Sequence, residues 1–205
     1  MKSPPHTPHQ DFPVHRSLGL EALFQQLDQN RLCSILDLGP ASGTNFRFWS
    51  PLISRMTFAD YYRTWEEEGF PRPEEGGSYE PIVSGLLSSV VSGEYDLILA
   101  WDLFNYLEPE QIHAVAQHLQ GHCSSEAMLL AMISPAPLIP AQPTTFKIVD
   151  REHLCYESRG PVTRNCPRYQ TRDLSRLMPD FRVINSFLLR HGIQEYLFLY
   201  QSSPV

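Results

Sequence analysis

The stretch from Cys33 to Thr44, CSILDLGPASGT, constrains the fold more than any other part of this chain. Its run SILDLG is almost entirely apolar up to an acid and a glycine, which is typical of a parallel strand buried on both faces. The residues that follow predict a tight turn and the start of a helix, and Asp60 ends the next apolar run, ISRMTFAD. In α/β proteins a strand, a turn and a helix in this order cradle a nucleotide-like ligand. We therefore expect an α/β fold with its binding site at this turn.

The first half of the chain alternates between helix and strand patterns around this turn. An amphipathic helix is predicted from Ser17, which is placed to cap it. A second helix is predicted over residues 43–54. Residues 79–93 suit either a helix or a short edge strand that runs into one, and a helix from about Pro81 is favoured. The run EYDLILAW then has the pattern of another buried strand.

The second half continues the alternation with one interruption. A helix is predicted to begin at Glu108 or Pro109, and EAMLLAMIS predicts a further buried strand. Residues 135–170 show no strong helical period, although FKIV and LCYE suit a short antiparallel pair. TRDLSRLMP predicts a short helix capped by Thr171, and two strands joined at 191–192 predict a terminal hairpin. This order predicts a three-layer α/β sandwich with a mostly parallel sheet and an antiparallel C-terminal strand.

The 205 residues suit a single domain with local insertions. Residues 1–16 are expected to form a flexible leader because their prolines prevent regular hydrogen bonding, and residues 17–205 to form the domain. The segment 135–170 follows a buried strand, so it emerges where ligands bind in α/β sheets. We expect it to act as a lid or substrate loop.

The formal net charge of −7 indicates that the protein repels nucleic acid and anionic membranes, so neither is an expected partner. The first residues lack the apolar core of a signal peptide, and no later run is long enough to span a bilayer. The cysteines show no disulfide-framework spacing, which indicates reduced thiols in a cytoplasmic protein. No paired ligand spacing supports a zinc site at His153, Cys155 and Cys166, so no metal is expected.

Four motifs together resemble the class I S-adenosylmethionine-dependent methyltransferases: ILDLGPASG, the strand-terminal Asp60, YDLILAWDLFNYL and the hairpin around Gly192. The resemblance implies a Rossmann-like sheet of seven strands, or of six if the third strand is missing. It also implies S-adenosyl-L-methionine as the cofactor, lying across the carboxyl ends of the first strands. The cofactor-binding residues that it implies are Asp37, Gly39, Ala41, Gly43, Asp60, Trp101 and Asp102.

Ala41 departs from the family pattern, which has a glycine at this position. The acid that contacts adenine is also unassigned, with Glu80 as a candidate. Both departures support an alternative hypothesis, a catalytically inactive methyltransferase-like module with a binding or regulatory role. A dinucleotide-binding protein would need glycines where this chain has Ala41 and Thr44, so that interpretation is disfavoured.

Methyl transfer from a sulfonium is an in-line displacement, which depends on positioning and, for some acceptors, on a base. Asp102, His153 and Tyr156 are the candidate bases. A small-molecule acceptor is expected, and the arginines of the 135–170 segment suit an anionic one. The candidate acceptor contacts lie after the predicted strands and in that segment: Asn105, Tyr106, Tyr156, Arg168, Tyr169 and Arg190.

Overall fold

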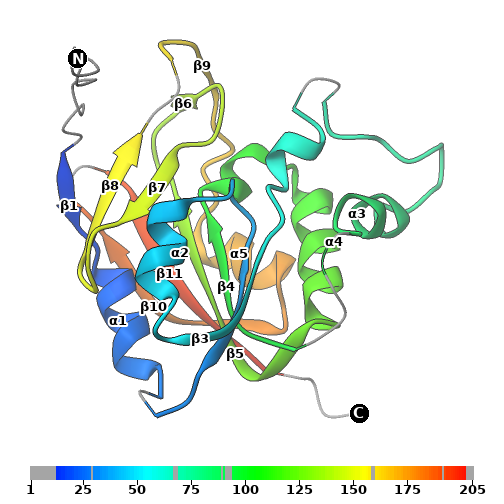
Figure 1. Ribbon diagram of the computed structural model, residues 1–205. Helices are drawn as coiled ribbons and strands as arrows, with labels where there is room; N and C mark the ends of the chain where they lie inside the picture. The colour runs from blue at the N-terminus through cyan, green and yellow to red at the C-terminus, as the bar shows by residue number, and fades with distance from the viewer. Residues whose placement is uncertain are drawn as a thin grey trace, which may run out of the picture.

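The computed structural model describes residues 13–28, 30–66, 69–88, 90, 94–157, 160–190 and 192–201. At its centre lies a sheet of six strands in the order β10-β11-β5-β4-β2-β3 (Figure 1). Their bounds are β2 (Cys33–Asp37), β3 (Ile53–Phe58), β4 (Tyr95–Trp101), β5 (Cys123–Ile133), β10 (Phe181–Leu188) and β11 (Gln194–Tyr200).

Strands β3, β2, β4 and β5 are parallel to one another, whereas β11 runs antiparallel to β5 and to β10. Strand β3 is an edge strand, because no further strand pairs with it within the described residues. The described sheet therefore has six strands, the number expected if the third strand of the family's seven is missing. Its carboxyl edge brings the ends of β2, β3 and β4 together.

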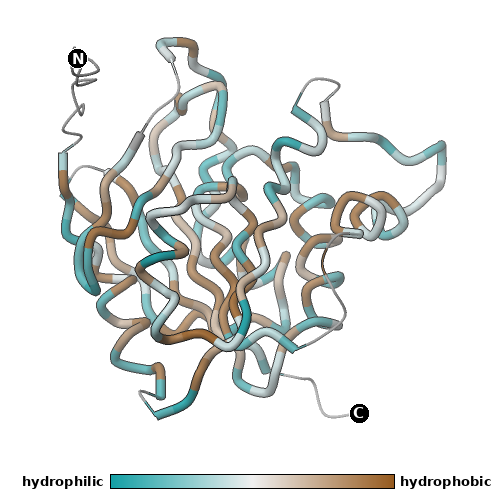
Figure 2. The backbone as a smooth tube through the Cα atoms, viewed as in Figure 1, coloured by the Kyte–Doolittle hydropathy of each residue, from teal (hydrophilic) through white to brown (hydrophobic). Residues whose placement is uncertain are grey.

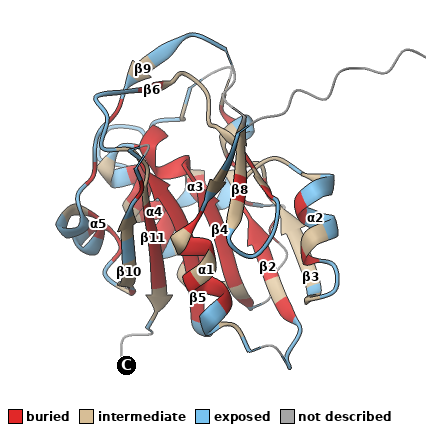
Figure 3. Cartoon of the chain, turned by 90° about the vertical axis from the view of Figure 1, so that its left-hand side faces the viewer, coloured by how far each residue is buried: buried red, intermediate tan, exposed pale blue. Residues whose placement is uncertain are grey.

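Helices cover both faces of this sheet, as expected from strands that are apolar on both sides (Figures 1 and 2). Ile35, Leu97 and Leu99 share one core cluster with α1 (Leu18–Gln26) and α2 (Gly43–Trp49). Their neighbours Leu36 and Ile98 pack in the other cluster with the remaining α-helices, which are α3 (Glu80–Leu86), α4 (Pro109–Gln120) and α5 (Thr171–Leu177). Figure 3 shows the central strands as the most continuously buried part of the chain. None of the described helices is long and apolar enough to cross a bilayer.

The 135–170 segment is built from four short strands rather than from an irregular loop. Strands β6 (Leu138–Pro140) and β9 (Thr163–Asn165) form one antiparallel pair. Strands β7 (Thr145–Ile148) and β8 (His153–Glu157) form another, which confirms the expected pairing of FKIV with LCYE.

The expected leader is wrong at its last residues. Val14–Arg16 form strand β1, which pairs with β8 and places the ring of His15 on that of Tyr156. Pro13 is the last proline before them, so their N–H groups are free to join the open edge of β8. Residues 1–12 lie outside the described part of the chain.

Two helix boundaries also differ from expectation. The second helix ends at Trp49 rather than at residue 54, because Pro51 cannot continue it and β3 begins soon after. Thr171 is the first residue of α5 and Gln170 is its N-cap, whose backbone N–H donates to the carboxylate of Asp173 at 3.1 Å. Ser17 does cap α1, since its hydroxyl accepts the N–H of Leu20 at 3.1 Å.

A buried acid in strand β11 anchors the N-terminal helix α1. Glu195 of β11 is completely buried, and its Oε2 accepts the N–H of Gly19 at 2.6 Å. A Cβ at position 19 would lie 3.0 Å from the Cβ of Glu195, so any larger residue would push the side chain of Glu195 away. Helix α1 therefore depends on β11 for both its position and the hydrogen bonding of its first turn.

Candidate active site

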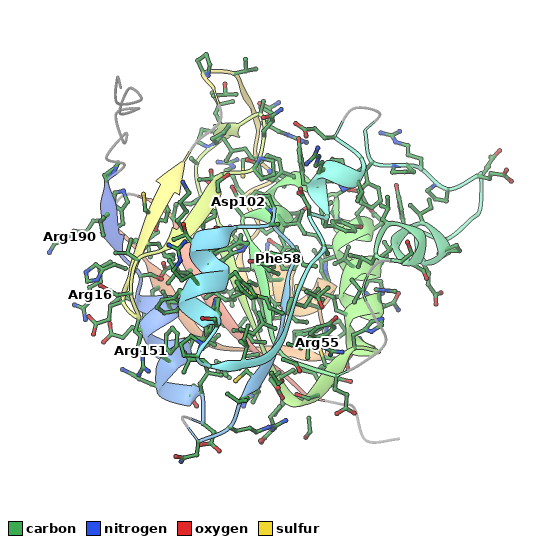
Figure 4. The ribbon with its side chains drawn as sticks, viewed as in Figure 1. Arg16, Arg55, Phe58, Asp102, Arg151 and Arg190 are labelled. Carbon is green, nitrogen blue, oxygen red and sulfur yellow. The ribbon has the colours of Figure 1, made fainter. Side chains whose placement is uncertain are left out.

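A cavity of about 450 Å³ lies at the carboxyl ends of β2, β3 and β4, below the inserted segment. Ligands bind at this edge in open α/β sheets. Asp102, at the end of β4, marks its position in the upper middle of Figure 4. The lining residues are Leu38, Gly39, Pro40, Asn45, Asp60, Tyr62, Arg63, Glu66, Ala100, Trp101, Asp102, Leu103 and Gln142–Phe146.

Asp37 lies at the end of β2 and holds the glycine turn, the segment between β2 and α2 that begins at Leu38, through a hydrogen bond to Gly39. Its Oδ1 accepts the N–H of Gly39 at 2.9 Å and the indole N–H of Trp101 at 2.7 Å. A Cβ at Gly39 would lie 3.0 Å from Cδ1 of Trp101 and 3.1 Å from Oδ1 of Asp37, so a larger residue would push these side chains away from the turn. Burial raises the pKa of Asp37 to about 7 despite these hydrogen bonds, and the nearby charge of Asp60 acts in the same direction.

Asp60 lines the cavity directly after β3. Its backbone has a φ of 39°, a left-handed conformation that Asp adopts more readily than most residues. The N–H of Asp60 donates to the carbonyl of Gly39 at 3.2 Å, which holds the end of β3 against the glycine turn. The carboxylate therefore stands where it can accept hydrogen bonds from a ligand on that turn.

Asp102 lies on the opposite wall and ties the cavity to its roof. Its Oδ2 accepts the N–H of Thr144 at 2.8 Å, and only 8% of the residue is exposed. Burial raises the pKa of Asp102 to about 7, an effect that the hydrogen bonds from Thr144 partly oppose. A carboxyl group with this pKa exchanges a proton readily near neutral pH.

The roof, residues 140–148, is fastened by polar contacts from several elements. Asn45 of α2 donates to the carbonyl of Phe146 at 3.0 Å and accepts the N–H of Ile148 at 2.9 Å. The hydroxyl of Tyr106, in the short helix η2 (Leu103–Tyr106), contacts the carbonyls of Pro140 and Gln142 at 3.1 and 2.9 Å.

Further contacts fasten the roof from the side of the short helix η1 (Tyr62–Thr64). The hydroxyl of Tyr62 donates to the carbonyl of Ala141 at 3.2 Å, and Glu66 accepts a hydrogen bond from the side chain of Gln142. The roof is thus part of the folded site.

The structure brings most of the expected cofactor residues together. Gly39, Asp60, Trp101 and Asp102 line the cavity, and Asp37 contacts two of them from below. Ala41 and Gly43 do not line it: both are exposed, and Gly43 is the first residue of α2. Glu80, the candidate for adenine contact, begins α3 and is also absent from the lining.

Of the three candidate bases, Asp102 alone lines the cavity. His153 is partly exposed and bonds the carboxylate of Asp150 at 2.9 Å. Tyr156 packs against the rings of Phe146 and His15 outside the lining.

The expected acceptor residues are scattered. Asn105 is buried and fixes the end of β5, donating to Met132 O at 2.9 Å and accepting from Ser134 N at 2.9 Å. Arg168 and Tyr169 line a separate, more open hollow. Arg190 lies at the α1 and β1 side of the molecule, far from Asp102 in Figure 4.

Several lining residues were not predicted from the sequence: Asn45, Tyr62, Arg63, Glu66 and Gln142–Phe146. Tyr62, Arg63 and Glu66 lie within six residues of Asp60, so a strand-end rule extended by about two helical turns would have found them. The roof residues carry no such signal, because their neighbours in the cavity are remote in sequence. No cluster of three or more metal-ligating side chains occurs in the described part of the chain.

The two buried carboxyl groups predict a specific pH dependence of stability. Their folded pKa of about 7 lies above the unfolded value, so the protonated forms stabilise the fold. This contribution is complete below about pH 4 and is lost as the pH rises through about 7. We expect the Asp37→Asn/Asp102→Asn double variant to lose less stability than the wild type between pH 5 and pH 8.5. Urea unfolding at several pH values measures this, and parallel curves would contradict it.

Comparison with models of protein families finds no match, and no curated protein sequence matches significantly. Solved structures do match. The N-methyltransferase NodS from Bradyrhizobium japonicum WM9 aligns with a TM-score of 0.50 and 10% identity, over 89% of this chain and 94% of that one. This likeness shows that the chain has a Rossmann-like α/β fold similar to that of NodS.

Two other solved structures align with lower TM-scores. The 1,6-didemethyltoxoflavin-N1-methyltransferase of Burkholderia thailandensis has a TM-score of 0.49 and 12% identity, over 90% of this chain and 78% of that one. TehB from Haemophilus influenzae has a TM-score of 0.46 and 15% identity, over 89% of this chain and 61% of that one.

Proposed function

We propose that the protein is an S-adenosylmethionine-dependent methyltransferase that acts on a small-molecule acceptor by in-line displacement. One observation carries the proposal: the carboxylate of Asp60 lines a cavity beside the glycine turn, at the strand edge where this fold binds ligands. A carboxylate directly after β3, the second of the parallel strands along the chain, suits the two hydroxyls of a ribose, because it can accept a hydrogen bond from each.

The charges of the cavity also fit this cofactor. S-adenosylmethionine supplies a methyl group on a positively charged sulfur and carries an ammonium group at its amino-acid end. Three carboxyl groups line the cavity, those of Asp60, Glu66 and Asp102, against one guanidinium, that of Arg63. Such a lining stabilises a cationic ligand.

Asp102 is the residue that we assign to proton transfer. It lines the cavity and is held by Thr144, so its carboxyl group has a fixed position. Its pKa of about 7 would let it take the proton released by an acceptor nitrogen or oxygen when the new bond to carbon forms.

The same charges favour a neutral or amine-bearing acceptor over the anionic one expected from the sequence. Arg168 and Arg190 do not line the cavity, and Arg151 lies over the ring of Phe24, with 5.3 Å between its guanidinium carbon and the ring centroid. An amine acceptor would bind in its neutral form and lose a proton during transfer, which gives Asp102 a function.

Calorimetry with S-adenosylhomocysteine, followed by transfer assays with labelled S-adenosylmethionine and a panel of amines and phenols, tests the proposal. We expect binding in the micromolar range and transfer to at least one amine. No binding at high micromolar concentration would refute the cofactor assignment. Binding without transfer to any member of the panel would instead favour the inactive binding module.

A further inference from the structure

Trp101 fills the space between the glycine turn and the inserted segment. It is the last residue of β4 and is only 5% exposed, although it lines the cavity. One edge of the indole lies against Gly39. Its face stacks on Phe146 of β7, with ring centroids 5.4 Å apart and planes 5° apart. The side chain therefore joins the floor of the cavity to its roof.

The backbone of Trp101 has a φ of 49°, in the left-handed region that a bulky side chain rarely adopts. Such a conformation persists when the surrounding contacts over-determine it, and it clusters at functional sites. Here those contacts are the glycine turn, Phe146 and Asp37.

The indole N–H of Trp101 donates to Oδ1 of Asp37 at 2.7 Å. The other oxygen of this buried carboxylate, Oδ2, receives no hydrogen bond within the described residues. The resemblance to the methyltransferases implies that Asp37, at the end of the first parallel strand, would hold the amino-acid end of the cofactor, which carries an ammonium group. Asp37 does not line the cavity, whereas Trp101 does, so the indole lies between this carboxylate and the space where the ligand would bind.

We propose that Trp101 is a specificity-determining gate, whose indole must leave Asp37 before the amino-acid end of the cofactor can bind. The proposal rests on the proposed function. It separates two classes of ligand: adenosine lacks an amino-acid end and binds with the gate in place, whereas S-adenosylhomocysteine must displace it. Because the indole stacks on Phe146, its displacement also alters the contact between β4 and β7, and β7 is part of the roof.

Calorimetry at pH 8.5, above the raised pKa of Asp37, tests the gate with both ligands. Trp101→Phe keeps an aromatic ring for the stack on Phe146 but removes the N–H donor. We expect this variant to bind S-adenosylhomocysteine about tenfold more tightly than the wild type, since no hydrogen bond to a carboxylate has to be broken. Its affinity for adenosine should be unchanged.

Trp49→Phe is the matched control. Trp49 is a fully buried indole that stacks on Phe24, has no hydrogen-bond partner for Nε1 and does not line the cavity. This control should bind both ligands like the wild type. If Trp101→Phe binds S-adenosylhomocysteine equally or more weakly, Trp101 is not a gate, while the proposed function stands. If neither ligand binds the wild type or the variant, both proposals fail.

A measurement on the wild type needs no variant. The chain has three tryptophans, and the indole nitrogens of Trp49 and Trp65 have no hydrogen-bond partner. In a protein labelled with 15N-tryptophan, the Trp101 indole proton should therefore resonate furthest downfield. We expect S-adenosylhomocysteine to move this signal and adenosine to leave it in place. A signal that stays in place while S-adenosylhomocysteine is bound would overturn the proposal.

Discussion

Replacing Asp60 by alanine is expected to weaken the binding of S-adenosylhomocysteine about 100-fold. The carboxylate lines the cavity at the end of β3, where it would accept hydrogen bonds from both ribose hydroxyls. Hydrogen bonds to a charged group contribute roughly 1.5–3 kcal/mol each, and a loss of about 3 kcal/mol in total corresponds to this factor. Calorimetry gives the dissociation constant directly.

Two further variants separate the loss of the ligand contact from other effects. Asp60→Asn keeps a residue that tolerates the φ of 39°, so it should fold like the wild type and still bind poorly. Glu75→Ala removes an exposed carboxylate outside the cavity lining and should bind normally. Wild-type affinity in both Asp60 variants would exclude this residue from the site.

Replacing Asn45 by alanine is expected to destabilise the protein by about 3–4 kcal/mol. Asn45 is 2% exposed, and its amide pairs with the carbonyl of Phe146 and the N–H of Ile148. Without it, both backbone groups remain buried and unpaired, at a cost of roughly 1–3 kcal/mol each. For a chain of this length, the melting temperature should fall by about 10 °C.

Asn165→Ala is the comparison for this change, because Asn165 is an exposed asparagine in β9 of the same insertion. Its melting temperature should stay close to that of the wild type. Thermal unfolding followed by circular dichroism measures both variants. Equal melting temperatures for the two would show that the amide of Asn45 does not fasten the roof.

The central elements of the fold were predictable because their signals are local. Strands β2 and β4 are continuous apolar runs, which burial on both faces requires. The glycine turn and Asp60 follow such runs directly, so the sequence located the floor of the cavity. Trp101 ends the apolar run of β4 and Asp102 follows it, and the family resemblance implied both as cofactor-binding residues.

The segment 135–170 was expected to cover the site, but the contacts that hold the roof were not predictable, because they join residues far apart in the chain. Asn45 occupies an ordinary polar position of a helix, and only the folded chain shows that it bonds Phe146 and Ile148. Strands β6 and β9 have three residues each, too few for any periodic pattern to stand out. The arginines of this segment suggested an anion site, yet hydropathy and spacing do not determine which way a short strand faces.

The contact between Glu195 and Gly19 has a consequence for how this chain folds during synthesis. Helix α1 is synthesised before β11, but the acid that completes its first turn lies in β11, 176 residues after Gly19. Strand β11 also lies inside the sheet, between β5 and β10. Helix α1 therefore stays undocked, and the edge of β5 stays open, until β11 has been synthesised. Such long-range closure slows folding and leaves apolar surface available to chaperones.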